Sequence, residues 1–527
     1  MKYSWDFPYP SRRMPVLARN AVATSQPLAS QAGLHMLRQG GNAIDAALAA
    51  AIALTVVEPT SNGIGSDAFA IVWEGDRLHG FNGSGRSPSA LSYEQYKNLA
   101  EMPRWGWDAV TVPGAVDAWA RLSERFGALP FEQLFEPASA YARDGFLVSP
   151  LTARGWAVME NRPEVFPSFT ETFLPGGRAP RAGELFRCPD QAETLEIIAR
   201  SRGESFYRGK LATTIADYAR ETGGILTSED LASHRGEWVT PLAQQYHDVC
   251  LHELPPNGQG IAALIALGIL KHLDIGGYPV DSPDSIHLQI EAMKIAFANA
   301  RRHIADPDSM RIAVKELLND NRLAEYARAI NMKQARFPET GVPTDHGTVY
   351  LSAADAGGMM VSFIQSNYCG FGSGIVVPGT GISLQNRGYG FVTTAGHPNC
   401  VGGGKKPFHT IIPGFITGDG KPLMSFGVMG GHMQPQGHVQ ITLRVCEYGQ
   451  NPQAASDAPR WHVAPECSVD LETGMDSVVA DVLRARGHTV RSAVAPGLFG
   501  GGQYILKLRD GYCAASDHRK DGQAVGY

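Results

Sequence analysis

The segment His346-Gly347-Thr348 contains the side chain best suited to covalent chemistry in this sequence. A threonine hydroxyl is a weak nucleophile at neutral pH unless a base lies beside it. If the peptide bond before Thr348 were cut, the freed α-amine would lie within reach of that hydroxyl, and its ordinary pKa of about 7.7–8.0 suits a general base. Gly347 places no side chain against the attacking oxygen. The pattern indicates an N-terminal nucleophile, although a Gly-Thr pair also commonly marks the plain start of a strand.

Other catalytic signatures do not occur in the sequence. It contains no G-x-S-x-G elbow, no H-E-x-x-H pair and no Walker lysine, and no G-x-G-x-x-G opens a helix after a strand. His432 and His438 have a spacing more typical of core or surface histidines than of a metal site. The seven cysteines are scattered and form no C-x-x-C pair, which argues against a zinc ribbon or a disulfide framework. We therefore expect neither a metal nor an organic cofactor.

Composition narrows the range of partners. The chain has 527 residues, of which 43% are hydrophobic, and a formal net charge of −6. Nucleic-acid binders usually carry a basic excess, so no nucleic-acid partner is expected. The first residues, MKYSWDFPYPSRR, lack the apolar stretch of a secretory signal, and the longest apolar run, residues 44–57, is too short to span a bilayer. These features favour a cytoplasmic protein that acts on a small molecule away from membranes.

The hydrophobic period changes to two where Thr348 occurs, so a sheet is expected to position this residue. Residues 348–354 and 359–366 are rich in β-formers, and the intervening Asp-Ala-Gly-Gly predicts a hairpin. The polar segment 331–347 before them predicts an exposed connection. Helical spacing predicts helices at 31–39, 43–57, 113–126, 260–273 and 286–303, and further strands are predicted at 406–416, 423–428 and 504–508. Early helices and late strands indicate an α+β architecture.

Several long motifs occur in order along nearly the whole chain. They are GGNAIDAALAAAIAL near the N-terminus, TVYLSAAD from Thr348, FGSGIVVPGTGISLQN from Phe371, GVMGG from Gly427 and SDHRKDGQAVGY at the end. Together they resemble the γ-glutamyltransferase family of N-terminal-nucleophile hydrolases. The resemblance implies a four-layer αββα sandwich, made as a proenzyme that cleaves itself.

The resemblance also implies how the chain is divided. Cleavage is expected between Gly347 and Thr348, giving a large α-rich part, residues 1–347, and a small β-rich part, residues 348–527, that begins with the nucleophile. The two parts would form one intertwined fold and remain associated, and the resemblance is compatible with a homo-oligomer.

Catalytic positions of the family carry over residue by residue. The nucleophilic threonine matches Thr348, and the paired glycines whose N–H groups form the oxyanion hole match Gly430 and Gly431. Ser366 stands where the family has a threonine that supports the nucleophile. Arg86 matches the arginine that holds a substrate carboxylate, although on its own it would be interpreted as a surface arginine.

The segment QNRGYG, residues 385–390, departs from the γ-glutamyl-transferring relatives. Those relatives place a glutamine and an aspartate here to hold an ammonium group, whereas this chain has Arg387 and Gly390. If Arg387 faces the pocket, it favours a carboxylate or carbonyl oxygen over an ammonium; the alternative is a structural ion pair. The residues expected to contact the substrate are Arg86, Asn386, Arg387, His409 and Thr410, the last two in place of a serine pair.

These residues favour a self-processing amidohydrolase without a cofactor. The bacterial branch that shares SFIQSN, FGSGIVVPGTGI and QNR resembles the oxamate amidohydrolases, and oxamate has a carboxylate beside its amide and no ammonium. Hydrolysis of oxamate to oxalate and ammonia is therefore the favoured reaction. The alternatives are a γ-glutamyl hydrolase or transferase acting on glutathione or related amides, an unprocessed non-catalytic binding protein, and a redox enzyme that uses the glycine-rich segments.

Overall fold

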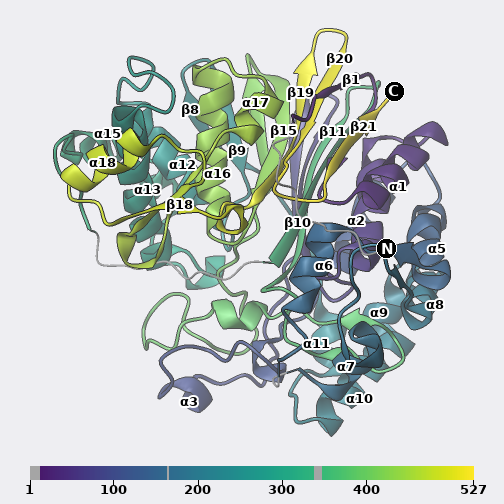
Figure 1. Ribbon diagram of the computed structural model, residues 1–527. Coiled ribbons are helices and arrows are strands. Elements are labelled where there is room, and N and C mark those ends of the chain that lie inside the picture. The colour runs from purple at the N-terminus through teal and green to yellow at the C-terminus, as the bar shows by residue number, and fades with distance from the viewer. Residues whose placement is uncertain (1–11, 163–164, 338–346) are drawn as a thin grey trace.

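Two seven-stranded antiparallel sheets pack face to face at the centre of the computed structural model, which describes residues 12–162, 165–337 and 347–527 (Figure 1). Sheet I contains, in order, β21 (Gln523–Gly526), β2 (Ala21–Thr24), β10 (Gly347–Ala354), β11 (Met360–Tyr368), β3 (Asp67–Glu74), β4 (Arg77–Asn82) and β7 (Glu237–Val239). Sheet II contains, in order, β1 (Val16–Ala18), β20 (Gly511–Ser516), β19 (Gly501–Leu508), β15 (Lys421–Met429), β14 (Gly414–Gly418), β9 (Val249–Glu253) and β8 (Leu242–Tyr246).

Helices cover the outer face of each sheet and complete four layers. Sheet I is covered by α1 (Pro27–Arg38), α2 (Ala43–Val57), α4 (Ala115–Phe126), α5 (Glu136–Asp144) and α8 (Pro189–Ser201). Sheet II is covered by α12 (Gly260–Leu270), α13 (Pro283–His303), α16 (Met433–Thr442) and α18 (Ser477–Ala485). No helix of the described ranges is long and apolar enough to cross a membrane.

The other helices and strands lie around this sandwich. The remaining helices are α3 (Tyr93–Tyr96), α6 (Pro150–Ala157), α7 (Pro167–Phe173), α9 (Glu204–Arg208), α10 (Lys210–Glu221), α11 (Ser228–Ser233), α14 (Val314–Leu317), α15 (Asp320–Ala329) and α17 (Pro452–Asp457). The remaining strands are β5 (Phe146–Leu147), β6 (Leu185–Phe186), β12 (Val376–Val377), β13 (Ile382–Ser383), β16 (Trp461–Val463), β17 (Val469–Glu472) and β18 (Val490–Val494).

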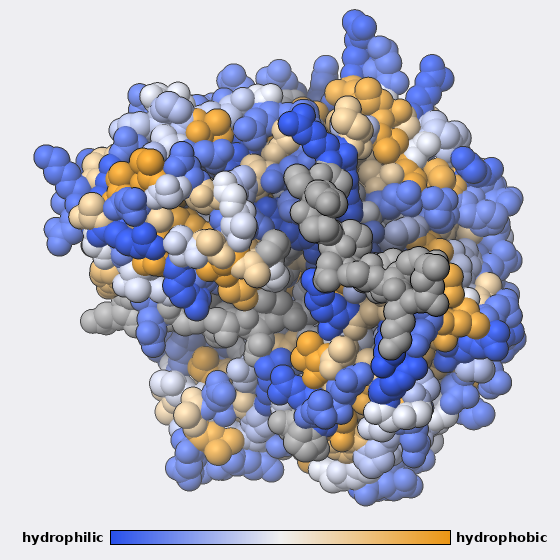
Figure 2. Space-filling model, in the orientation of Figure 1, coloured by the Kyte–Doolittle hydropathy of each residue, from blue (hydrophilic) through white to orange (hydrophobic). Residues whose placement is uncertain are grey.

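Three hydrophobic cores fill the three spaces between the layers. Along β10 the side chains alternate, so that Val349 and Leu351 pack under α2 while Tyr350 packs between the sheets. The apolar residues are concentrated in these cores, and the visible face of the molecule is mostly hydrophilic, with hydrophobic side chains in small separate groups (Figure 2). The predicted α+β class and four-layer αββα sandwich are confirmed.

Local sequence explains why the best-predicted elements form. Asn42 caps α2 through a capping box with Asp45, and every residue of that helix is buried, as expected for its unbroken apolar run. The hairpin between β10 and β11 is also confirmed: its turn is closed by hydrogen bonds between Asp355 and Met359 and between Gly358 and Asp355, where Gly358 has a φ of +98°.

Some boundaries differ from the prediction. The strand expected at 406–416 begins only at Gly414, because Pro407 and Pro413 remove backbone donors from the segment before it. Strands were expected mainly late in the chain, yet both sheets also take strands from its first 253 residues. Of the connection expected at 331–347, residues 331–337 form no helix or strand, and residues 338–346 lie outside the described ranges.

The two sheets approach closely where β10 crosses β15. The hydroxyls of Ser352 and Ser425 are hydrogen-bonded, and two residues further along, Tyr350 packs on Gly427. Residue numbers fall along β10 as they rise along β15. The start of β10, at Thr348, and the residues that follow β15 therefore lie at the same end of the sandwich.

This contact predicts a stability effect. A Cβ at position 427 would lie 2.4 Å from the Tyr350 ring, which is fully buried and whose hydroxyl is 2.7 Å from that of Ser362. Gly427→Ala should therefore lower the free energy of unfolding by about 1–3 kcal/mol through overpacking. Thermal unfolding measures the effect, with Gly418→Ala as the control, because an added Cβ at position 418 would lie 3.9 Å from its nearest neighbouring atom. Equal melting temperatures for the two variants would contradict the assigned contact.

Candidate active site

Thr348 lies near the start of β10, in the middle of sheet I, and only 3% of its surface is exposed. Gly347 before it is held by a close approach of two backbones, since a Cβ there would lie 2.2 Å from the backbone nitrogen of Gly370. Glycine is thus required at 347 for packing. The bond between Gly347 and Thr348 lies inside the sandwich end, beside β11.

The hydroxyl of Ser366 on β11 connects the two groups that would react. Its oxygen lies 3.1 Å from Thr348 Oγ1 and 2.5 Å from the carbonyl oxygen of Gly347, and it accepts the N–H of Tyr368 at 2.8 Å. A hydroxyl has one proton to donate and two acceptor sites. Because Ser366 donates to Gly347, it must accept from Tyr368 and from the hydroxyl of Thr348.

This arrangement can transfer a proton during attack on the Gly347 carbonyl. As the Thr348 oxygen adds to the carbonyl carbon, its proton can pass to Ser366 while Ser366 donates its own to the Gly347 oxygen. The same hydroxyl stabilises the negative charge that develops on that oxygen. The three groups are therefore organised for an intramolecular attack before any α-amine is free.

Gly430 and Gly431 connect β15 to α16, at the end of the sandwich that also contains Thr348. Their φ angles of +123° and +55° lie in the region that favours glycine. No hydrogen bond of either N–H group occurs among the described residues, whereas the carbonyl of Gly431 accepts from Gln259 at 2.9 Å. Two unused donors at the start of a helix are suitable for an oxyanion.

Arg387 lies in a buried polar cluster and has no carboxylate in ion-pair contact within the described residues. Only 1% of it is exposed, its Nη1 donates to Thr410 Oγ1 at 2.7 Å, and its guanidinium carbon lies 4.8 Å from the centre of the Tyr368 ring. Its Nε and Nη2 have no hydrogen-bond partner in that part of the chain. Burial lowers the pKa of Arg387 to about 10, although the nearby charge of Asp67 opposes this shift. A guanidinium with two unused nitrogens can bind a carboxylate in bidentate fashion.

His409 is paired with Asp67, a residue that sequence reasoning missed. His409 Nε2 lies 3.0 Å from Asp67 Oδ2, and the N–H of Ile411 approaches its Nδ1 at 3.4 Å, so the tautomer carries its proton on Nε2. Burial, followed by the charges of Arg387 and Lys406, holds the pKa of His409 well below its usual value. Burial raises the pKa of Asp67 to about 7. The only signal of Asp67 in the sequence is a charge at the head of an apolar strand.

Two of the predicted substrate contacts lie in other environments. The amide of Asn386 accepts from the N–H of Cys369 and donates to the carbonyl of Arg104, so it is used to hold backbone. Arg86 is 2.8 Å from Asp306, with 43% of its side chain exposed, and lines a separate cavity of about 230 Å³. The structure thus brings Thr348, Ser366, Arg387, Thr410 and His409 into one connected neighbourhood, and gives Asn386 and Arg86 partners of their own.

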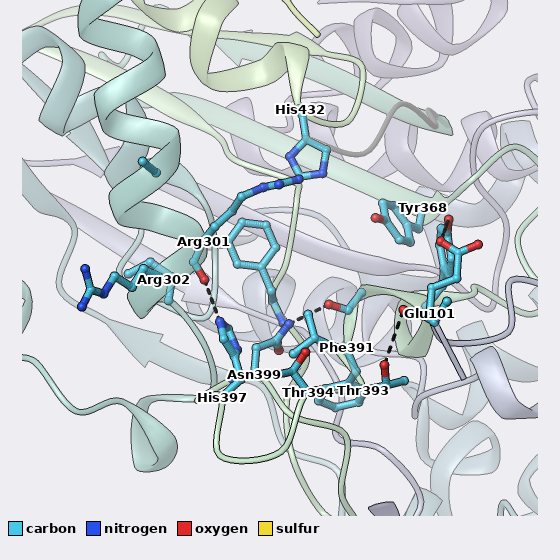
Figure 3. A pocket seen from close by; sticks show the side chains of 17 residues that line it. Glu101, Arg301, Arg302, Tyr368, Phe391, Thr393, Thr394, His397, Asn399 and His432 are labelled. Carbon is cyan, nitrogen blue, oxygen red and sulfur yellow. Dashed lines mark hydrogen bonds between the residues drawn. The ribbon is translucent and has the colours of Figure 1, made fainter. Parts of the chain in front are cut away.

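A cavity of about 840 Å³ opens beside this neighbourhood (Figure 3). It is lined by Tyr368, which pairs with Gly347 across the strands, and by His432, which follows Gly431. Phe391 and Phe408 give it an apolar surface. The cavity is therefore bordered by a residue paired with Gly347 and by a residue next to Gly431, and no pattern in the sequence indicates it.

One buried cluster outside this site has the residue types of a metal site. His287, Glu291 and His488 could place three ligand atoms within 4.8 Å of one another. The ammonium of Lys294, however, lies 2.9 Å from Glu291 and 3.2 Å from His488. A cationic side chain thus already lies against this cluster.

Comparisons with known proteins show which family the chain resembles along its length. The family model described as Gamma-glutamyltranspeptidase matches residues 29–527. The chain is 36% identical over 449 residues to the glutathione hydrolase-like YwrD proenzyme of Bacillus subtilis (84% of this chain, 85% of that protein). It is 36% identical over 528 residues to the oxamate amidohydrolase proenzyme of Klebsiella pneumoniae (95% and 97%). The crystal structure of cephalosporin acylase from Bacillus halodurans superposes with a TM-score of 0.95 at 48% identity, over 100% of this chain and 99% of that one.

The shared hydroxyl leads to a prediction about chain cleavage. Ser366→Ala removes the proton donor to Gly347 and the acceptor for Thr348, so cleavage should slow on the order of a hundredfold, whereas Ser366→Thr keeps the hydroxyl and should cleave within about tenfold of the parent rate. Gel mobility of freshly made protein over time measures both. Equal rates for the alanine variant and the parent chain would mean that Ser366 is not part of the reaction.

Proposed function

The chain belongs to the gamma-glutamyltranspeptidase family, and on that premise we propose that it is a self-processing amidohydrolase whose nucleophile is Thr348. The observation that carries the proposal is the position of the Ser366 hydroxyl, 3.1 Å from the Thr348 oxygen and 2.5 Å from the Gly347 carbonyl oxygen. Relatives of the chain are proenzymes by their names, and one is an amidohydrolase.

Processing would begin with attack of Thr348 Oγ1 on the carbonyl carbon of Gly347. The peptide C–N bond between Gly347 and Thr348 then breaks, and the Thr348 nitrogen takes up the proton that the hydroxyl released. An ester now joins the Gly347 carbonyl carbon to the Thr348 oxygen. Water hydrolyses that ester, which leaves a carboxylate on Gly347 and restores the hydroxyl of Thr348, now beside a free α-amine. Sheet I contains β2, β3, β4 and β7 from before the cleaved bond and β10, β11 and β21 from after it. We therefore expect the two fragments to stay associated.

The processed site would use the same oxygen on an external amide. The α-amine of Thr348 takes the hydroxyl proton, the oxygen adds to the substrate carbonyl, and the N–H groups of Gly430 and Gly431 stabilise the oxyanion. The proton then passes to the departing amine as the C–N bond breaks. Water releases the acid from the acyl-enzyme and restores Thr348.

Arg387 determines the substrate class in this proposal. A buried cation with two unused nitrogens favours an acyl group that carries a carboxylate close to the amide, and it disfavours the ammonium of a γ-glutamyl group. At Gly390 a Cβ would lie 2.8 Å from the carbonyl oxygen of Phe408, so an aspartate there would require the backbone to move. Oxamate meets the requirement at Arg387. The cavity of about 840 Å³ exceeds the size of oxamate, which favours N-substituted oxamates and longer dicarboxylic monoamides as well.

A substrate panel tests the proposal. Oxamate, N-phenyloxamate and glutaramate should be hydrolysed with a higher kcat/KM than γ-glutamyl-p-nitroanilide. Arg387→Met should lower kcat/KM for the carboxylate substrates about a hundredfold, the usual effect of losing a charged hydrogen bond, and should leave the slow turnover of neutral propionamide nearly unchanged. Preferred turnover of the glutamyl compound would overturn the substrate class, and the absence of any amide hydrolysis by the cleaved protein would overturn the activity.

The pKa of Asp67 predicts how binding depends on pH. Because burial raises that pKa to about 7, Asp67 is neutral below this pH and negative above it. Its negative charge offsets that of Arg387, so the KM for a carboxylate substrate should rise a few-fold as the pH increases through about 7. Asp67→Asn should abolish this rise in a steady-state profile, and propionamide should show none in either protein. The same rise in the asparagine variant would assign the titration to another group.

A further inference from the structure

Arg301 is a second guanidinium beside the candidate site. It lies near the end of α13 and lines the cavity of about 840 Å³, where it is half-buried. In Figure 3 its side chain extends from the helix toward His432. Arg302 also lines the cavity, but its side chain extends in the opposite direction, away from His432. Arg302 is exposed.

Among the residues that the structure describes, no carboxylate balances the charge of Arg301. Its guanidinium forms no hydrogen bond or ion pair with any residue that the structure describes. Burial lowers the pKa of Arg301 to about 10, and the groups that oppose this shift are Tyr368 and Cys467, which are not carboxylates. A partly desolvated cation without a carboxylate is unfavourable unless a ligand supplies the anion.

The other walls of the cavity do not supply that anion. Glu101 lies across the cavity from Arg301, on the side of Tyr368 (Figure 3). Its carboxylate accepts a hydrogen bond from the hydroxyl of Tyr389 at 3.4 Å. His397 lies 3.1 Å from the carbonyl of Arg301, and burial lowers the pKa of His397, which leaves it neutral. An anion in the cavity would therefore be attracted to the wall of Arg301 and repelled from the wall of Glu101.

Arg387 and Arg301 differ in how deeply they are buried, and this difference indicates different roles for the two side chains. Arg387 is almost fully enclosed beside Tyr368, where the acyl group must remain while it is bound to Thr348. Arg301 is less buried and lines the cavity, through which the amine must depart. We propose that Arg301 binds an anionic group on the amine part of the substrate, so that the enzyme acts on amides with an anion on each side of the cleaved bond. This inference rests on the proposed amidohydrolase function.

A matched pair of substrates tests this role. N-(4-carboxyphenyl)oxamate carries a carboxylate on the departing amine, and N-phenyloxamate does not. The cleaved wild-type enzyme should prefer the carboxyphenyl compound about tenfold or more in kcat/KM, the size expected for one charged hydrogen bond. Arg301→Met should reduce this preference to about one, Arg301→Lys should keep part of it, and the control Arg302→Met should keep all of it. Each variant is first checked for chain cleavage on a gel.

The outcomes distinguish this inference from the function on which it rests. Hydrolysis of both oxamates at equal rates by the wild-type enzyme, or an unchanged preference in Arg301→Met, would overturn the role of Arg301 and leave the amidohydrolase intact. Hydrolysis of neither compound by the cleaved enzyme would overturn the amidohydrolase function and the role of Arg301 with it. If Arg301→Met is not cleaved, Arg301→Lys is compared with Arg302→Met instead. The proposal is contradicted if both variants prefer the carboxyphenyl compound as strongly as the wild-type enzyme does.

Discussion

One hydroxyl group, that of Ser366, lies between the Thr348 oxygen and the Gly347 carbonyl, the two groups that would react in the proposed cleavage, and the rest of the fold holds it there. It donates to the Gly347 carbonyl, and the N–H of Tyr368 fixes its position. β10 and β11 are neighbouring strands in the middle of a sheet that is covered on both faces, so neither strand can shift without disturbing two cores. The hydrogen bonds of one serine thus depend on the packing of the whole sandwich.

The same packing places charge where water cannot screen it. Arg387 and Asp67 both lie in the interior, and the pKa of each is displaced by burial. In such surroundings an electrostatic contact is stronger than at the surface, and so is the penalty for a mismatched group. One arginine in place of a neutral amide can therefore change which substrates the site accepts, although the sandwich around it is that of the whole family.

Local patterns in the sequence predict some elements of the fold and some residues of the site, and the remaining features depend on contacts between distant segments. A long apolar run predicted α2, and a glycine-containing turn between period-two runs predicted the β10–β11 hairpin. β3 was not predicted, because nearly all of its residues are buried on both faces and its apolar run therefore shows no alternation. The spatial pairing of His409 with Asp67 and the cavity at Arg301 join segments far apart in the chain, which no local pattern encodes. Asn386 was expected at the substrate, but its amide holds backbone.

In the proposed reaction, Thr348 becomes the first residue of a fragment and then acts as the nucleophile. Amino-terminal sequencing and intact mass of the purified, active protein test it most directly. We expect two fragments, of which the smaller begins Thr-Val-Tyr-Leu and corresponds to residues 348–527. A fragment with any other first residue, or full amidase activity in a chain that remains uncut, would contradict it.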